Sequence, residues 1–458
     1  MLPAAILVTI LSGFAIVNMI AVRFSMQEKL GLSFLVGMAF QTILMVLLDQ
    51  LNIAVTPVSI TAATSVAVAA MLPFLYRKRQ HIITPVKVKG INGLWIVFIG
   101  FIVYIEYMNF TKCLYFPTYD RDSLAGFDTI GYIISREHTI RHLSIFQGDY
   151  MPSIHGPGSY ITYAPMVQLS YAYVYMFGAE TSKLIPALMF GFFLLAFYGA
   201  ALRAIGTSGA AVATFFAMMT PQMLSWSSLS GTNVIHAIYA SLGVIYFTLW
   251  FRKREQSMLS MGALLLGINA WCRSEGIVFI GACLFIMLID AIIRKQYKAL
   301  IECTLIAAAP ALLWTLFMKV NGLYAEGIIS THLIVDGAKL KTIWDAMTNH
   351  YSNTIYYGLT FIGLPVAILL NIKSLIKEKD NIQLLAVILL SSFLYMFLLY
   401  QVTYTWDSIN NVLAYSAKRF LFCFTPMIWY YVFSNGSVVT AFLKLDGLFA
   451  REKAITVK

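Results

Sequence analysis

The sequence predicts an all-α, polytopic integral membrane protein, and three observations predict this fold class. Of the 458 residues, 59% are hydrophobic and only 12% are charged, which is about half the charged fraction of a typical soluble chain. The mean hydropathy is +0.76. Apolar runs long enough to cross a bilayer, about 20 residues each, recur from Pro3 to near the C-terminus. We therefore expect one bundle of membrane-spanning helices rather than several soluble domains.

About thirteen windows of roughly 18 to 21 mostly apolar residues qualify as spanning helices. They begin near Pro3, Gly31, Thr56, Asn92, Lys183, Gly209, Asn233, Ser257, Glu275, Ala299, Thr354, Ile382 and Arg419. The first run has no basic segment before it, so we expect a retained helix rather than a cleaved signal peptide. We divide the chain into N-terminal transmembrane helices, residues 1–90, and a main transmembrane module, residues 91–458.

The basic residues fall in short clusters in every second connection between these runs. The clusters include Arg23, Arg77 to Arg79, Arg203, Arg252 to Arg254, Arg294, Lys373 and, near the C-terminus, Lys444, Arg451 and Lys453. Because basic connections stay on the cytoplasmic side, we expect the N-terminus outside and the C-terminus in the cytoplasm. The net charge of +11 then reflects topology, and we expect no nucleic-acid partner. The five cysteines show no metal or disulfide spacing and are expected to pack as small hydrophobic side chains.

The connections on the predicted outer side are the long ones. They comprise residues 113–182, 321–353 and 403–418. Since long ordered loops are often functional, we expect the working face to be outside. In the first loop, apolar residues at helical spacing between Ile130 and Leu143 predict an amphipathic helix on the membrane surface. The tyrosine-rich segment Ser159–Gly178 suits an interface or a re-entrant element better than a full span.

The densest acidic segment contains Asp120, Asp122 and Asp128, just after the fourth span. Carboxylates at this position could act as a general base or hold a divalent ion. The alternative is a solvated loop in which Asp122 or Ser123 caps the following helix. Because two carboxylates in a loop are weak grounds for a metal site, we expect no metal ligands.

Cations occur on the predicted outer side at two places where the topology would not put them. Arg273 and Glu275 lie in a tight turn between two apolar runs, and Lys418 and Arg419 begin the last span. Charges at a membrane-embedded turn are costly, and adjacent cations suit a phosphate or a lipid headgroup. The alternatives are an internal Arg–Glu pair that stabilises the turn and side chains that reach up to the headgroups.

A further group of polar residues on the outer side could bind a substrate. His155 lies in a turn and is followed by Tyr160 and Tyr163, and Asp407 follows Trp406. Glu275 of the tight turn belongs to the same group. Tyrosine and tryptophan could stack on sugar rings, although aromatic residues also form ordinary interface belts. A single loop histidine is more often structural than catalytic.

Taken in order along residues 91–458, these features resemble the GT-C superfamily of polyprenyl-phosphate-dependent glycosyltransferases, which includes protein O-mannosyltransferases and aminoarabinose transferases. The resemblance rests on Asp120 to Asp128 with the amphipathic helix, His155 to Pro165, Arg273 to Gly276, and Lys418 with Arg419. Members carry an essential aspartate in an outer loop, which implies Asp122 as the catalytic base, with Asp120 and Asp128 as alternatives. That loop usually follows the first span in the family, whereas about three helices precede it here.

The resemblance implies transfer of a sugar from a polyprenyl-phosphate donor to a hydroxyl group of a glycolipid, polysaccharide or protein, with inversion at the anomeric carbon. Arg273, Lys418 and Arg419 would bind the donor phosphate and lipid. We expect no cofactor, with a divalent metal as the less favoured alternative, and a location in the bacterial cytoplasmic (inner) membrane. Two other functions stay open: a transporter or flippase of lipid-linked or polar solutes, and a polysaccharide polymerase or ligase. Charges at the outer mouth and the lack of a visible repeat favour an enzyme over a transporter.

Overall fold

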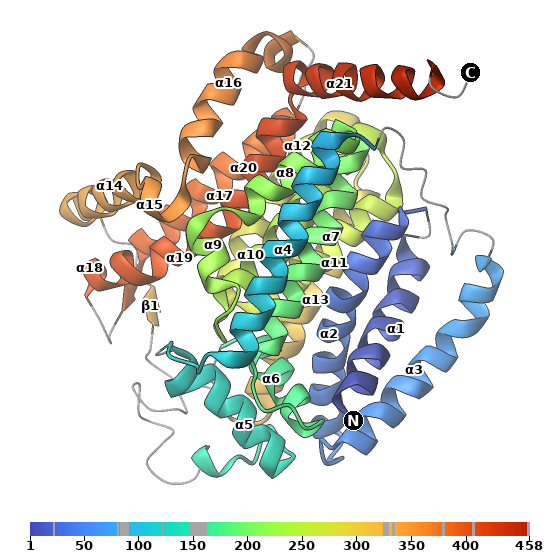
Figure 1. Ribbon diagram of the computed structural model, residues 1–458. Coiled ribbons are helices and arrows are strands. Elements are labelled where there is room, and N and C mark those ends of the chain that lie inside the picture. The colour runs from blue at the N-terminus through green and yellow to red at the C-terminus, as the bar shows by residue number, and fades with distance from the viewer. Residues whose placement is uncertain are drawn as a thin grey trace.

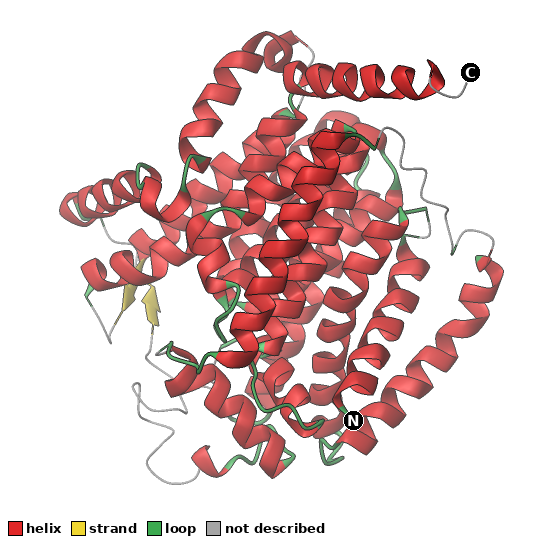
Figure 2. Cartoon of the chain, viewed as in Figure 1, coloured by secondary structure: helices red, strands yellow, loops and turns green. Residues whose placement is uncertain are grey.

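The protein is helical almost throughout, as Figure 2 shows. The computed structural model describes residues 1–21, 23–79, 82, 91–120, 122–146, 163–323, 329–331, 335–377, 381–404 and 408–455. Within these ranges the strands are β1 (Ile329–Thr331) and β2 (Val402–Tyr404), which pair antiparallel with Ser330 opposite Thr403. This pairing joins the second and third predicted outer loops.

Ten helices of the described chain are long and apolar enough to cross a membrane, which indicates an integral membrane protein. They are α1 (Leu2–Ile20), α2 (Met26–Gln50), α3 (Pro57–Arg77), α4 (Gly93–Tyr115), α7 (Leu184–Ile205), α10 (Asn233–Lys253), η6 with α12 (Ser274–Gly276 and Ile277–Arg294), α13 (Lys298–Val320), α16 (Thr360–Lys377) and α17 (Ile382–Gln401).

The other three expected spans correspond to shorter or interrupted helices. The run beginning near Gly209 is α8 (Thr207–Met218), and the one beginning near Ser257 is α11 (Gln256–Cys272). At 1.5 Å per residue, even the 17 residues of α11 extend about 25 Å, less than the hydrocarbon thickness of about 30 Å. The last run is a broken helix. It comprises α18 (Ile409–Val412), η7 (Leu413–Ala417), α19 (Lys418–Phe420), η8 (Leu421–Cys423) and α20 (Phe424–Ser434).

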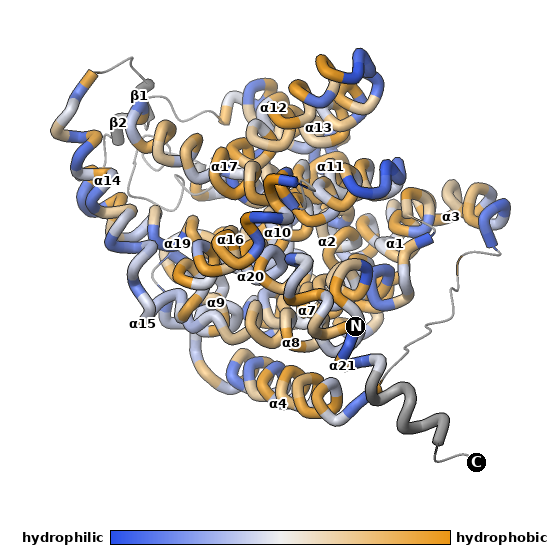
Figure 3. Tube along the Cα trace, turned by 90° about the horizontal axis from the view of Figure 1, so that it is seen from above, coloured by the Kyte–Doolittle hydropathy of each residue, from blue (hydrophilic) through white to orange (hydrophobic). Residues whose placement is uncertain are grey.

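The centre of the bundle is formed by α10, whose side chains are buried from Asn233 to Trp250. Seen along the bundle in Figure 3, other helices surround α10 and α20, whereas α3 and α4 lie at the rim. Two helices approach very closely at the N-terminal side. A Cβ atom on Gly13 of α1 would lie 1.8 Å from the Ser33 carbonyl oxygen of α2, and one on Gly37 would lie 2.0 Å from the Thr9 carbonyl oxygen. Glycine is therefore required at this crossing, as at many membrane helix interfaces.

The first predicted outer loop contains two short α-helices that pack on protein. In α5 (Asp128–Glu137), Ile130 and Ile134 are buried, and a Cβ atom on Gly131 would lie 2.7 Å from the Tyr171 Cβ atom of α6 (Met166–Met176). The helix ends at His138, which has a φ of 56°. The predicted surface helix from Ile130 to Leu143 is therefore shorter than expected.

For the segment Ser159–Gly178 the sequence suggests an interface or a re-entrant element, and its described part is buried rather than placed at an interface. Residues Met166 to Val174 of α6 are all buried, and two of its tyrosines bond to main-chain carbonyl groups. The Tyr171 hydroxyl donates to Gly231 at 3.3 Å, and the Tyr173 hydroxyl donates to Ala5 at 3.0 Å. These hydroxyls are therefore satisfied inside the protein rather than at the headgroups.

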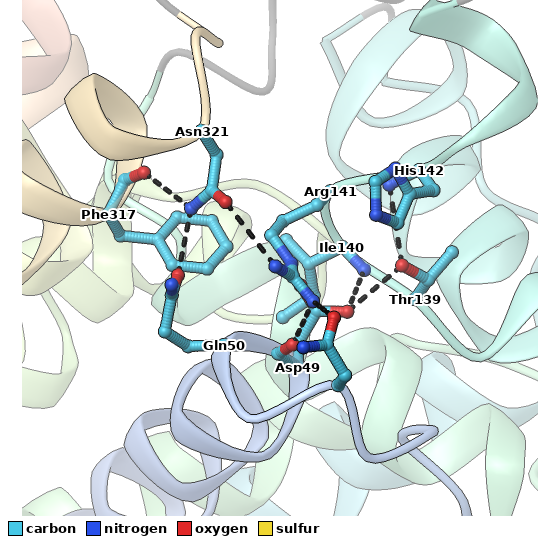
Figure 4. A network of polar contacts seen from close by, with 9 residues as sticks. Asp49, Gln50, Thr139, Ile140, Arg141, His142, Phe317 and Asn321 are labelled. Atoms are coloured by element: carbon cyan, nitrogen blue, oxygen red, sulfur yellow. Dashed lines mark hydrogen bonds and ion pairs between the residues drawn. The ribbon is translucent and has the colours of Figure 1, made fainter.

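A buried ion pair fixes the segment that follows α5 (Figure 4). The Arg141 Nε atom lies 2.9 Å from Asp49 Oδ2 at the end of α2, and Asp49 Oδ1 accepts from the Thr139 hydroxyl at 2.9 Å and from the Ile140 amide at 3.0 Å. Asn321, just after α13, also accepts from Arg141 at 3.5 Å. These contacts of Asp49, Thr139, Ile140, Arg141 and Asn321 form a clasp that joins the end of α2, the turn after α5 and the end of α13.

The remaining helices lie beside or across the bundle. α14 (Gly337–Tyr351) and α15 (Thr354–Tyr357) project at one side, and α21 (Gly436–Ile455) crosses the end of the bundle opposite α5 (Figure 1). Asp446 of α21 accepts from the Thr207 amide at 3.1 Å and from the Ser208 amide at 3.4 Å, at the first turn of α8. The Asn92 amide group donates to the same carboxylate at 3.1 Å.

Candidate functional site

The three aspartates of the acidic segment have different partners. Asp120 Oδ2 accepts from both the amide and the hydroxyl of Ser123 at 3.0 Å, and so caps η2 (Ser123–Phe127). Asp122, the expected cap, makes no capping bond. Asp128 accepts from the Tyr175 hydroxyl at 2.6 Å. The capping role therefore belongs to Asp120, and Asp122 is available for another contact.

Asp122 forms an ion pair with Arg419 of α19, although 297 positions separate them in the chain. The guanidinium also donates through Nε to the Tyr415 carbonyl oxygen at 3.1 Å, and it lies 5.4 Å from the centre of the Trp226 ring. The side chain of Asp122 is 32% exposed and that of Arg419 is 16% exposed. The pair is therefore half-buried and open to solvent on the aspartate side.

Arg273 forms the second ion pair of the site. It reaches Glu275 through two bonds, of 2.6 Å and 3.2 Å, and it donates to Asn233 Oδ1 at 2.6 Å. Arg273 has an extended backbone between α11 and η6, which turns its side chain toward the start of α10. The internal Arg–Glu pair considered from the sequence is therefore present, and Asn233 of α10 fixes its orientation.

Tyr163 lies within electrostatic range of both ion pairs. Burial raises the pKa of its hydroxyl, and four charged side chains act on it electrostatically. They are Arg273, Glu275, Asp122 and Arg419. Its ring also packs edge-on against Phe127, with centroids 5.5 Å apart. Groups from the first predicted outer loop, the α11–α12 turn and the last broken helix therefore all act electrostatically on one phenol.

Lys418, another expected site residue, points away from the two ion pairs. Lys418 places its ammonium group 3.8 Å from the centre of the Tyr356 ring of α15. Successive helical residues point about 100° apart, which separates Lys418 from its neighbour Arg419. His155, Tyr160 and Asp407 lie outside the described residues.

Asp128 belongs to a second polar cluster, at the N-terminal end of α7. Its partner Tyr175 has a pKa raised by burial and by the bond to Asp128. Lys183, which is only 3% exposed, interacts electrostatically with Asp128, and burial lowers the pKa of its ammonium group.

An aromatic cluster includes Tyr395, which acts electrostatically on Arg273. The Phe420 ring stacks on Tyr395, with centroids 3.6 Å apart, and on Phe279, with centroids 5.4 Å apart. His236 is buried against the same cluster, 5.8 Å from Phe420, and it interacts electrostatically with Arg273.

Several residues of these sites are not among those singled out from the sequence. They are Asn233, His236, Trp226 and Lys183. The available signal is a polar residue inside or at the edge of an apolar run, because such residues are rare in spans and mark functional positions. Asn233 and His236, three positions apart, lie on one face of α10.

In the described part of the chain, no three His, Cys, Asp or Glu side chains lie close enough to hold a metal ion together. The chemistry offered by the described residues is therefore that of two arginines and one accessible carboxylate. This arrangement suits an anionic group and a hydroxyl nucleophile.

Comparison with known proteins adds no name to this arrangement. No protein-family model, no curated protein sequence and no solved structure matches the chain.

Proposed function

We propose that the protein is a membrane glycosyltransferase that moves a sugar from a polyprenyl-phosphate donor to an acceptor hydroxyl on the extracytoplasmic face. The observation that supports this proposal is the gathering of Asp122, Arg419 and Arg273 around Tyr163. Two guanidinium groups supply the charge that a phosphate leaving group requires, and an aspartate lies beside them. The apolar helices around them provide a lipid-compatible setting.

The proposed reaction is a single displacement at the anomeric carbon. The acceptor oxygen forms a bond to that carbon while the bond from the carbon to the phosphate oxygen breaks, which inverts the configuration. Asp122 takes the proton of the acceptor hydroxyl, and Arg419 and Arg273 stabilise the negative charge on the departing phosphate. Donor phosphate would compete with Asp122 for Arg419 and so free the carboxylate to act as a base.

The remaining features complete the proposal. We place the acceptor, a glycolipid, polysaccharide or protein, at the same outer face, and the chain in a bacterial inner membrane with its N-terminus outside. In this arrangement the shorter α8, α11 and the last broken helix count as crossings together with the ten longer helices, which gives about thirteen.

The test is transfer by the purified full chain from synthetic polyprenyl-phosphate sugars, with Asp122→Asn, Arg419→Gln and Arg273→Gln variants. Loss of a general base is expected to lower the turnover of D122N by about 10²- to 10⁴-fold. We expect R419Q and R273Q to weaken the binding of polyprenyl phosphate by about 10- to 100-fold, since each removes a charge-assisted contact.

The matched control is Asp290→Asn. Asp290 pairs with Arg254 at 2.8 Å and with Arg294 at 2.9 Å, where the ends of α10 and α12 lie close together. None of these three residues belongs to the two ion pairs proposed to bind the donor. D290N should transfer sugar at the parental rate. Unchanged transfer by D122N would remove Asp122 from catalysis.

A second candidate function is transport of a lipid-linked or polar solute, which one observation favours. Glu106 lies within the span α4, and ionisable groups inside spans are typical of transport pathways. Uptake or flipping by reconstituted vesicles, with no new glycosidic product, would support this candidate over sugar transfer.

A further inference from the structure

A carboxyl group that the proposed reaction does not use lies inside the membrane-spanning part of α4. Glu106 is 13 residues after Gly93 and nine before Tyr115, the two ends of the helix. At 1.5 Å per residue it lies about 20 Å from one end and about 14 Å from the other. The neighbouring side chains Tyr104 and Tyr107 are 61% and 66% exposed, so this stretch of α4 borders the lipid.

The contacts of Glu106 are polar but uncharged. Its Oε2 atom accepts from the Asn109 amide at 3.3 Å, and Asn109 Oδ1 accepts from the Ser227 hydroxyl at 3.1 Å. Its Oε1 atom faces α7 at Gly191, where an added Cβ atom would lie 3.3 Å away. Gly191 has no side chain, and the Glu106 carboxyl group fills the space that a side chain would occupy there.

Within the described ranges, no cation pairs with Glu106. The titratable group that interacts with it is Cys113 on the same helix. Lys112 and Lys183 act on that thiol, but neither is an ion-pair partner of the carboxyl group. The packed helix α8 contains no titratable residue, and α7 presents Gly191 to it.

Glu28 provides a direct comparison, because it also lies in a span. Its carboxylate is fully buried, and it is held by Arg203 through two bonds of 2.7 Å and 2.8 Å and by the Ser25 amide at 2.8 Å. A paired carboxylate keeps its charge. An unpaired one in an apolar medium is more stable with a proton, because the charged form loses its solvation.

We propose that Glu106 is a membrane-embedded proton-binding site, a neutral carboxylic acid at the junction of α4 and α7 that an apolar carbodiimide can reach from the lipid and modify. In that modification the acid proton moves to a carbodiimide nitrogen, and the carboxyl oxygen bonds to the central carbon. The acyl group then shifts from oxygen to nitrogen to give a stable N-acylurea. Nothing is oxidised or released, so the adduct carries the mass of one whole carbodiimide.

The experiment treats the full chain in lipid vesicles with dicyclohexylcarbodiimide at pH 7 and maps the adduct by peptide mass spectrometry. We expect an adduct on Glu106, none on Glu28, and none at position 106 in the Glu106→Gln variant. The rate should fall about tenfold per pH unit once the carboxyl group ionises at higher pH. A water-soluble carbodiimide with an added amine should instead modify exposed carboxylates such as Asp345.

Two results would overturn the proposal. One is the absence of any adduct on Glu106 at pH 7, and the other is equal modification of Glu106 and Glu28. Both are read in the parental protein, so the outcome holds even if E106Q folds poorly. A sugar-transfer assay on the same samples keeps this question separate from the proposed function.

Discussion

At the scale of single residues, burial and pairing decide what each charge in this membrane protein does. Asp49 and Arg141 have side-chain exposures of only 4% and 12%, and each has the other as its counter-charge. Asp290 pairs with Arg254 and Arg294, but its partners are 33% and 55% exposed. The same chemical pair therefore has a structural role at the first position and little stabilising role at the second.

Replacing Asp49 by Asn should destabilise the protein by about 3–5 kcal/mol, because it leaves the Arg141 guanidinium buried without a counter-charge. The matched Asp290→Asn change should cost about 0–1 kcal/mol, as is usual for exposed pairs. Thermal unfolding of both variants in detergent would measure the difference. Equal losses would mean that the clasp in Figure 4 is no stronger than a surface pair.

At the scale of elements, hydropathy predicts which segments are spanning helices, but not where the backbone breaks. The ten long spans coincide with predicted runs because apolar length alone determines them. The run expected from Thr354 is divided at Gly358, which has a φ of 58°, into α15 and α16. Such a break depends on how the chain packs, and the mean hydropathy of an 18-residue window does not detect it.

The attachment of α14 is an element whose stability should depend on pH. His350 Nε2 bonds to the Leu413 carbonyl oxygen at 2.9 Å, and burial lowers the pKa of this imidazole, with Lys418 lowering it further. In the undocked helix the His350 imidazole would have its ordinary pKa of about 6.5. The undocked state would therefore bind more protons than the docked state as the pH falls through that value. Lower pH should therefore weaken the docking of α14.

Hydrogen exchange of Gly337–Tyr351 would measure this effect, with α5 as the internal reference for the intrinsic change of exchange rate with pH. We expect faster exchange of α14 relative to α5 at pH 5.5 than at pH 7.5. The His350→Gln variant, which does not titrate, should show no such change. A pH effect that persists in H350Q would assign the dependence to another group.

At the scale of the whole molecule, the candidate site depends on contacts between distant parts of the chain. The sequence indicates that Asp122, Arg273 and Arg419 share one side of the membrane, because the charge pattern predicts topology. It does not indicate which of three aspartates meets Arg419, since spacing along the chain carries no information about a contact across 297 positions. Nor does it indicate that Lys418 turns to α15.

Sidedness can be measured because all five native cysteines are buried. A membrane-impermeant maleimide should leave the parental protein unlabelled in intact cells. Cysteine at the exposed position Asp345 of α14 should be labelled from outside, and cysteine at the exposed position Lys444 of α21 only after permeabilisation. The reverse pattern would put the ion pairs in the cytoplasm and contradict the proposed sugar transfer.

The amides of the first turn of α8 donate hydrogen bonds to Asp446, which attaches α21 to the bundle. Amides at a helix start have no partner in the helix itself, and a carboxylate both satisfies them and complements their dipole. A chain shortened before position 446 would leave these α8 amides without their carboxylate partner, so the truncation should destabilise the bundle. Fusion partners are accordingly better joined after α21 than in its place.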